Sequence, residues 1–279
     1  MWHWLAVLAA VSVAGPAQMM AEVSSPKNDY NLSYDRYERL LVFARSDADF
    51  ANAKIHVAAK HRGRWSEPEP IWFSDARYSD TDPWLTPDGK TLYFASNRAT
   101  DGGPARKDLD LWRARRDRAG LWSVPEPLGA AVNGPGPELG PELHGDTLYF
   151  SSARKGGKGG LDIYTARRTP DGFEGAAPIG APFNTATSES DFTLSADGRR
   201  AVFWRMVGSR GVLHVAERTR AGWSEPAALP GRVNIGPFNF TPSFTRDESG
   251  LSFASTRPRP GQVEGMADIF IVKLGRMPN

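Results

Sequence analysis

The chain has 279 residues, of which 40% are hydrophobic and 24% are charged, and its formal net charge is +2. This length and apolar content are sufficient for one large folded domain. The near balance of basic and acidic residues argues against a nucleic-acid-binding protein. The chain contains no cysteine, which excludes disulfides, thiolate chemistry and a lipid-modified cysteine.

Residues 1–21 have the pattern of a secretory signal peptide. An apolar run at residues 5–14 is too short to span a bilayer, and small residues follow it. Cleavage after Ala17 and cleavage after Ala21 both fit, and the choice stays open. A buried N-terminal helix is the alternative, because no Lys or Arg precedes the apolar run. We expect a periplasmic or secreted protein whose mature form does not span the membrane.

An internal repeat is the strongest pattern in the sequence. One phenylalanine recurs late in each alternating strand, at spacings of 51, 56, 53 and 50 residues. These residues are Phe43, Phe94, Phe150, Phe203 and Phe253. Turn residues such as Pro87-Asp88-Gly89 precede the phenylalanine, and a short strand follows it. Periods of this length are typical of repeat architectures.

Four of the repeats contain four short strands that are separated by turns and show no helical periodicity. This pattern predicts a blade of a β-propeller. We therefore expect an all-β fold, a five-bladed β-propeller of four-stranded antiparallel blades, as one domain over residues 22–279. The expected blades cover residues 28–78, 79–136, 137–187, 188–237 and 238–279.

The fifth repeat lacks its own outer strand, because the chain ends where the next aromatic residue is due. Propellers commonly close with a strand from the other terminus, which removes an exposed sheet edge. Counting back from the first blade places this closing N-terminal strand near residues 19–24. Cleavage after Ala17 would keep this strand, whereas cleavage after Ala21 would leave a stub.

Three segments carry a resemblance to a known family: residues 82–98 (DPWLTPDGKTLYFASNR), 120–133 (GLWSVPEPLGAAVN) and 156–168 (GGKGGLDIYTARR). They resemble the WD40-like propeller repeats of TolB-type periplasmic proteins, and the resemblance covers nearly all of the mature chain. It implies a binding propeller of the bacterial envelope. TolB-type proteins have six blades and an additional N-terminal domain, whereas this sequence has five repeats.

Three repeats carry an arginine after the second strand and an aspartate on the third strand. The pairs are Arg98 with Asp110, Arg154 with Asp162 and Arg257 with Asp268. The equivalent positions hold Asp47 with Lys54 in the first repeat and two valines in the fourth. Lone or like charges that face each other destabilise a sheet, so we expect the charged pairs to form salt bridges inside their blades. A binding role for the arginines is the alternative.

A second polar set begins each innermost strand, about fourteen residues before the repeated phenylalanine: Asp29, Asp80, Glu138, Glu189 and Asn239. Because the first strand of a blade lines the central channel, we expect these groups at one channel mouth. They would bind a ligand, a cation or the basic end of a partner. The equal alternative is that each carboxylate accepts backbone N–H groups. Both interpretations extend to Asp82 and Asp191. No motif indicates a cofactor, and the histidine spacing indicates no metal site.

The sequence favours a non-catalytic binding module that engages a protein or peptide partner, or an envelope component, through one face and the channel mouth. The competing hypothesis is a glycoside hydrolase of the five-bladed propeller type. Such an enzyme needs two carboxylates about 5–10 Å apart, and Asp29, Asp80, Glu138 and Glu189 are candidates. These carboxylates occupy equivalent positions from blade to blade, which favours binding. A narrow channel would also favour binding, whereas a wide cleft would favour the enzyme.

Overall fold

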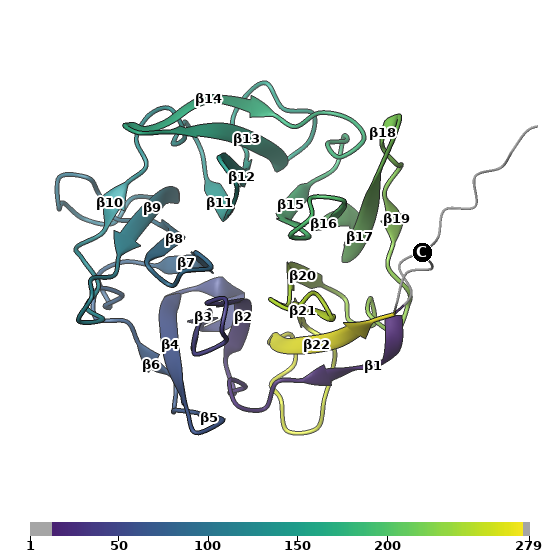
Figure 1. Cartoon of the computed structure of the whole chain (residues 1–279), viewed down its shortest axis with the longest axis horizontal. Coiled ribbons are helices and arrows are strands. Elements are labelled where there is room, and N and C mark those ends of the chain that lie inside the picture. The colour runs from purple at the N-terminus through teal and green to yellow at the C-terminus, as the bar shows by residue number, and fades with distance from the viewer. Residues whose placement is uncertain (1–12, 276–279) are drawn as a thin grey trace, which may run out of the picture.

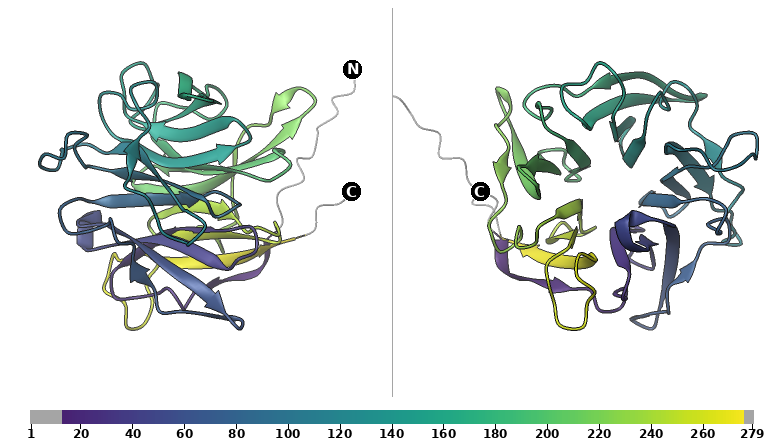
Figure 2. Two further views of the ribbon diagram at one scale, coloured as in Figure 1. Left: turned by 60° about the vertical axis from the view of Figure 1, so that its left-hand side comes forward. Right: turned by 180° about the vertical axis from the view of Figure 1, so that it is seen from behind.

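The computed structural model describes residues 13–275, which form five antiparallel sheets around a central axis (Figure 1). The expected five-bladed all-β propeller, closed by an N-terminal strand, is confirmed. Figure 2 shows the same ring obliquely and from behind. The short 3₁₀ segment η1 (Ala48–Phe50) is the one helical turn in the described residues. No helix in residues 13–275 has the length and apolarity needed to cross a membrane.

The strands of each blade are consecutive in the sequence, except for the one contributed by the N-terminus. Blade 1 contains β2 (Asn28–Tyr34), β3 (Leu40–Ser46), β4 (Lys54–His61), β5 (Arg64–Trp65) and β6 (Glu69–Pro70). Blade 2 contains β7 (Asp80–Leu85), β8 (Thr91–Ser96), β9 (Asp110–Arg115) and β10 (Glu126–Pro127). Blade 3 contains β11 (Glu138–His144), β12 (Thr147–Ser152), β13 (Asp162–Thr169) and β14 (Gly172–Pro178).

The last two blades complete the ring. Blade 4 contains β15 (Glu189–Leu194), β16 (Arg200–Val207), β17 (Arg210–Thr219), β18 (Gly222–Trp223) and β19 (Ala227–Ala228). Blade 5 contains β20 (Asn239–Phe244), β21 (Gly250–Ser255), β22 (Asp268–Leu274) and, at its outer edge, β1 (Val13–Met19). The innermost strands β2, β7, β11, β15 and β20 surround the axis (Figure 1). All five begin at the same face of the ring, because every blade repeats the same topology.

The repeated phenylalanines form the core of the blades. All five lie on the second strand and are at most 1% exposed. Phe150 stacks on Tyr164 of the third strand, and Phe253 stacks on Phe270 in the same way, with ring centroids 5.8 and 6.0 Å apart. Burying one such side chain contributes about 1.5–3 kcal/mol, so the repeated phenylalanine explains why each repeat adopts the same sheet.

The closing strand lies earlier in the chain than residues 19–24, so that prediction is wrong in position. Strand β1 pairs with β22 and places Gln18 opposite Ile271 and Met19 opposite Phe270. In the other blades the aromatic residue of the outer strand precedes the next innermost strand by 15 or 16 residues. Val13 occupies the corresponding place, 15 residues before β2 and opposite Leu274, so no aromatic residue marks the strand.

The position of β1 bears on the expected signal peptide. Strand β1 covers residues 13–19, so the propeller includes residues that were predicted to belong to the signal peptide, residues 1–21. Cleavage after Ala17 would remove most of β1, and cleavage after Ala21 would remove all of it. Residues 1–12, which hold most of the apolar run, lie outside the described residues. The signal peptide stays a prediction.

A chain that starts at Glu22 is expected to be less stable than one that keeps β1. It loses the pairing with β22 and two buried side chains, Val13 and Met20, of which Met20 contacts the Tyr34 hydroxyl. Each buried apolar side chain contributes about 1.5–3 kcal/mol. We expect a melting temperature lower by about 5–15 °C, measured by thermal unfolding of both chains. Equal melting temperatures would contradict a closing role for β1.

Candidate functional site

The carboxylates at the starts of the innermost strands are buried ion-pair partners. Asp29, Asp80, Glu138 and Glu189 are all 0% exposed. The pairs are Asp29 with Arg45 at 2.6 Å, Asp80 with Arg98 at 2.7 Å, Glu138 with Arg154 at 3.0 Å and Glu189 with Arg205 at 3.0 Å. In blade 5, Asn239 replaces the carboxylate and accepts a hydrogen bond from Ser255 Oγ at 2.8 Å. The structure therefore gives these five groups internal partners.

Every blade has an arginine near the end of its second strand: Arg45, Arg98, Arg154, Arg205 and Arg257. The guanidinium carbon of each arginine lies 5.2–5.5 Å from the ring centroid of the repeated phenylalanine. Each arginine also donates a hydrogen bond to a carbonyl of the loop that enters the blade: Val23, Phe73, Val132, Phe183 and Val233 are the acceptors. In blades 1 to 4 one side chain thus holds the first strand, the second strand and the entering loop together, whereas Arg257 of blade 5 makes no ion pair with the first strand.

The predicted pairs Arg98–Asp110, Arg154–Asp162 and Arg257–Asp268 are not formed. Asp110 pairs with Arg106 and Asp268 with Arg259, while Asp162 accepts the backbone N–H groups of Lys158 and Gly159. Arg257 makes no ion pair in residues 13–275 and lies 4.1 Å from the Phe270 ring centroid. The register explains the error in blade 2, because Ser96 stands opposite Asp80 on one side and Asp110 on the other.

Sequence reasoning also missed Arg45 and Arg205 as members of the set. They follow the phenylalanine by two residues, whereas Arg98, Arg154 and Arg257 follow it by four. Arg45 and Arg205 therefore lie on the same face of the second strand as the phenylalanine, and the other three arginines follow two residues after that strand ends. Searching both spacings after the phenylalanine for arginine would have found all five.

The open part of the channel mouth is a pocket of about 280 Å³ at the face where the innermost strands begin. Its walls are mainly apolar: Tyr30, Phe50, Leu109, Leu139, Leu161, Trp204, Phe238 and Phe240. Its polar groups gather at Asp82 and Asp191, each preceded by a hydroxyl residue, Thr81 or Ser190. The carboxylates that face the channel are therefore Asp82 and Asp191. They follow Asp80 and Glu189 of the predicted set by two residues.

A bulge in every innermost strand brings these residues into the channel. The pairing register shifts at the same place in all five blades. The residue at each bulge has a positive φ: Asn31 (53°), Asp82 (51°), Gly140 (54°), Asp191 (57°) and Thr241 (47°). Positive φ is uncommon outside glycine and is an outlier for a β-branched threonine. Such strain costs about 1–3 kcal/mol per residue and is concentrated at functional sites.

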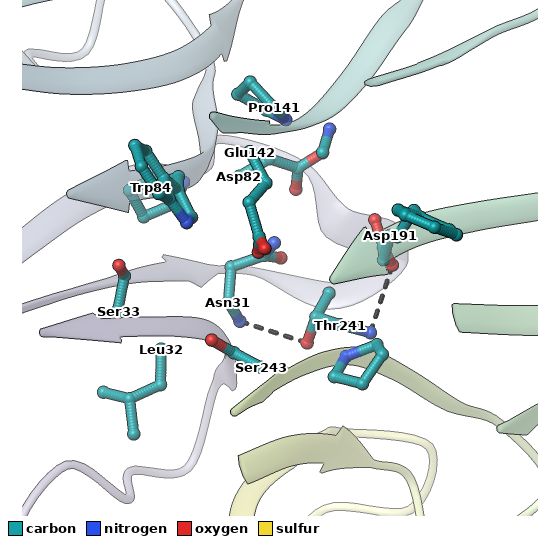
Figure 3. A pocket seen from close by; sticks show the side chains of 14 residues that line it. Asn31, Leu32, Ser33, Asp82, Trp84, Pro141, Glu142, Asp191, Thr241 and Ser243 are labelled. Carbon is teal, nitrogen blue, oxygen red and sulfur yellow. Dashed lines mark hydrogen bonds between the residues drawn. The ribbon is translucent and has the colours of Figure 1, made fainter. Parts of the chain in front are cut away.

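The two channel aspartates accept backbone N–H groups from the following blade. Asp82 Oδ2 accepts from Gly140 N at 3.0 Å. Asp191 Oδ2 accepts from Thr241 N at 3.1 Å (Figure 3). Asp191 Oδ2 also accepts from Trp204 Nε1 at 2.7 Å. A Cβ at position 140 would lie 2.8 Å from Asp191 Oδ1, so any residue other than glycine would displace the Asp191 carboxylate. Asp82 and Asp191 thus meet on either side of Gly140.

Burial changes the protonation of three channel carboxylates. It raises the pKa of Asp82, and it raises the pKa of Asp191 to about 7, with the negative charge of Asp82 as a second cause. Burial also raises the pKa of Glu142 to about 7, although Leu194 N and Thr193 Oγ donate hydrogen bonds to its carboxylate at 3.0 and 3.1 Å. Near neutral pH the two aspartates therefore do not both hold a full negative charge.

Beyond the mouth, the channel narrows to a cavity of about 30 Å³ between Asp82, Trp84, Glu142 and Asp191, which we call the waist (Figure 3). A cavity of this volume holds one or two water molecules. On the far side of the waist, a pocket of about 260 Å³ is lined in part by Arg246. Residues 13–275 contain no group of three or more His, Cys, Asp or Glu side chains arranged to hold a metal ion.

Arg246 spans the far end of the channel. It extends from blade 5 and donates to the carbonyl oxygens of Tyr34 and Leu85, the latter at 2.8 Å. These carbonyls belong to the innermost strands of blades 1 and 2. The channel is therefore narrow in the middle and crossed by a side chain beyond it.

The sequence matches no known family model and no curated protein. Among solved structures, a thermostable family-43 glycoside hydrolase has a TM-score of 0.63 and 12% identity, over 94% of this chain and 97% of that one. The catalytic domain of the Coprinopsis cinerea GH62 α-L-arabinofuranosidase has a TM-score of 0.57 and 10% identity, over 95% and 98%. TolB from Acinetobacter baumannii has a TM-score of 0.52 and 14% identity, over 90% and 56%.

These comparisons define the class of protein by its fold. At identities of 10–14% the similarity shows that the chain has a β-propeller fold, but it does not show what the protein does. Propellers described as TolB and as glycoside hydrolases are both among the similar structures, and this chain spans 56% of the TolB chain. The choice between binding and catalysis depends on the channel itself.

A double-mutant cycle is expected to place Arg98 with Asp80 and not with Asp110. Asp80→Asn or Arg98→Met alone leaves a buried charge without its partner, which costs about 3–5 kcal/mol. We expect a coupling energy of about 1–3 kcal/mol for Asp80 and Arg98, measured by chemical denaturation. The matched cycle of Asp110→Asn with Arg98→Met is expected to give less than about 0.5 kcal/mol. Coupling of equal size in both cycles would refute the assignment.

The channel aspartates are expected to make stability depend on pH. The pKa of Asp191 is raised from 3.8 to about 7, so the folded state binds more protons between these values and its stability falls as pH rises. The difference in unfolding free energy between wild type and Asp191→Asn should fall between pH 4 and pH 7.5. We expect this difference to decrease by on the order of 2 kcal/mol. This is less than the full pKa shift would give, because the Asp191 carboxylate borders an open channel.

Asp197→Asn is the control with the opposite sign. Hydrogen bonding from Ser195 lowers the pKa of Asp197, so its contribution to stability is present above pH 4 and is lost as pH falls below it. The comparison is made by chemical denaturation of wild type, Asp191→Asn and Asp197→Asn at several pH values. A pH-independent difference between wild type and Asp191→Asn would contradict the raised pKa.

Proposed function

We propose that this protein is an exported, non-catalytic binding propeller of the TolB type that engages a protein or peptide partner through its channel mouth. The observation that carries the proposal is the pocket of about 280 Å³, with apolar walls and two channel aspartates. A concave apolar pocket with a few converging polar groups is the usual form of a binding site.

The chemistry of the pocket favours a chain end that combines an apolar side chain with an ammonium group. Phe50 and Phe240 present aromatic surface, and their ring centroids lie 5.5 Å apart in an edge-to-face arrangement. Asp82 and Asp191 provide negative charge deeper in the pocket. A peptide amino terminus or a lysine side chain carries the matching positive charge. Aromatic residues in such sites supply much of the binding energy.

Phe50 is the wall residue most exposed to a partner. It is 42% exposed and lies in η1, where Asp49 and Phe50 both have positive φ, at 54° and 58°. The edge of its ring packs against Tyr30, with centroids 5.3 Å apart. A strained, half-exposed aromatic residue at the rim of a pocket is available to cover an inserted side chain.

Glycoside hydrolysis is the second candidate, and one observation favours it. Asp82, Glu142 and Asp191 come from three different blades, and the pKa of two of them is raised to about 7, as a general acid requires. The family-43 glycoside hydrolase shares the fold. Against it, the waist between these carboxylates has about 30 Å³, which admits water and excludes a sugar ring. The narrow waist supports binding at the mouth.

The proposal is tested with displayed random peptides that have free amino termini. We expect selection of a peptide whose synthetic form binds the protein in calorimetry and loses at least about tenfold in affinity when its amino terminus is acetylated. Phe50→Ala is expected to weaken binding by a similar factor, because it removes part of the apolar wall. The double variant Asp82→Asn with Asp191→Asn should do the same by removing the charge.

Tyr37→Ala is the matched control, because Tyr37 is an aromatic residue that is 66% exposed on the turn after β2, at the opposite face. It should bind as wild type does. Failure to select any peptide, or equal binding by Phe50→Ala and wild type, would refute the proposal. Release of p-nitrophenol from an arabinofuranoside or xyloside that Glu142→Gln abolishes would favour the second candidate.

A further inference from the structure

The aspartate on the third strand has a common task in three blades. In blade 2, Asp110 pairs with Arg106 of the loop between the second and third strands. In blade 3, Asp162 accepts the N–H groups of Lys158 and Gly159 from the equivalent loop, at 2.7 and 3.0 Å. In blade 5, Asp268 pairs with Arg259 of that loop. In each case the carboxylate holds the loop against the end of its own blade.

Blade 1 departs from this arrangement. Lys54 occupies the position of these aspartates, because it stands opposite Arg45 as the first residue of the third strand. The loop of blade 1 turns through η1 toward the channel, where Phe50 lines the mouth. The space beside Lys54 is a pocket of about 330 Å³ lined by Lys27, Arg45, Asp47, Asn52, Lys54 and Tyr78, among others.

Cationic and amide donors predominate in this pocket. Lys27 pairs with Asp47 at 2.7 Å, and Arg45 pairs with the buried Asp29 at 2.6 Å. Lys54 makes no ion pair within the part of the chain that the structure describes. Even with Asp29 and Asp47 counted, the local charge is positive, because three cations face two carboxylates.

The neighbouring groups leave this positive charge in place. Asp47 is already held by Lys27 and by Asn52 Nδ2 at 3.0 Å, and the hydrogen bond from Lys27 lowers the pKa of Asp47. Burial lowers the pKa of His56 to about 4, so the imidazole is neutral at physiological pH and adds no charge. Among the described residues that line this pocket, Lys54 is thus the cation that forms no ion pair.

We propose that this pocket binds a small oxyanion, a carboxylate or a phosphate group carried by a molecule of about the size of a monosaccharide. Its volume of about 330 Å³ lies at the lower end of the range for small-molecule sites. Lysine and arginine provide charge-assisted hydrogen bonds to such an anion. Pro70 and Tyr78 add ring surfaces for the body of the ligand. This pocket shares no lining residue with the channel mouth.

Calorimetry with three probes tests the proposal: glucose 6-phosphate, citrate and uncharged glucose, at low ionic strength where charge contacts are not screened. We expect the protein to bind at least one anion and not glucose. Binding of glucose 6-phosphate alone identifies a phosphate ligand, and binding of citrate alone identifies a carboxylate ligand. Binding of neither anion, or equal binding of glucose, would overturn the proposal.

Lys54→Asp tests the assigned cation, because it introduces the residue that blades 2, 3 and 5 carry at this position. We expect at least a tenfold loss of affinity for the anion. Lys90→Asp makes the same charge change on an exposed turn of blade 2 at the opposite face, and it should bind as wild type does. If Lys54→Asp unfolds, Lys27→Gln is the second variant. We expect it to lose affinity for the anion by about threefold to tenfold. Affinity equal to wild type in the folded variants would overturn the assignment.

Discussion

The buried contact between an arginine and a carboxylate is the interaction on which four of the five blades depend. In four blades it joins the start of the innermost strand to the end of the second strand, and the same guanidinium holds the entering loop. Burying two charges costs nearly as much as their attraction returns, so such a pair contributes more to geometry than to net stability. In blade 2, Arg98 Nη2 lies 2.7 Å from both carboxylate oxygens of Asp80.

This fixed geometry determines what the channel can hold. An arginine holds the carboxylate at the start of the innermost strand in blades 1 to 4, and Ser255 holds Asn239 in blade 5. The bulge two residues later directs Asn31, Asp82, Gly140, Asp191 and Thr241 toward the axis. The residues at the ion pairs are nearly the same in every blade, whereas the residues at the bulges differ. The repeat therefore supplies the frame, and departures from the repeat supply the chemistry of the channel.

The fold follows from sequence periodicity because strands and turns are local. The five phenylalanines, the turn residues and the missing outer strand were sufficient to predict five blades and a closing strand. The site was harder to predict, since partner choice depends on register: Ser96 stands between two aspartates, and the sequence does not say which one Arg98 reaches. Positive φ at Asp82 and Asp191 has no sequence marker, because only Gly140 among the five bulge residues is a glycine.

The crossing of the channel by Arg246 changes how the ring as a whole resists opening. The boundary between blades 5 and 1 is joined at its outer edge by β1 and at its axis by the bond from Arg246 to the Tyr34 carbonyl. Between these two radii, Asp29 N donates to Ala267 O at 2.8 Å. An open array of repeats unfolds from its ends, with stability close to the sum of unit and neighbour terms. A ring fastened at three radii has no free end, so its blades are coupled and unfold together.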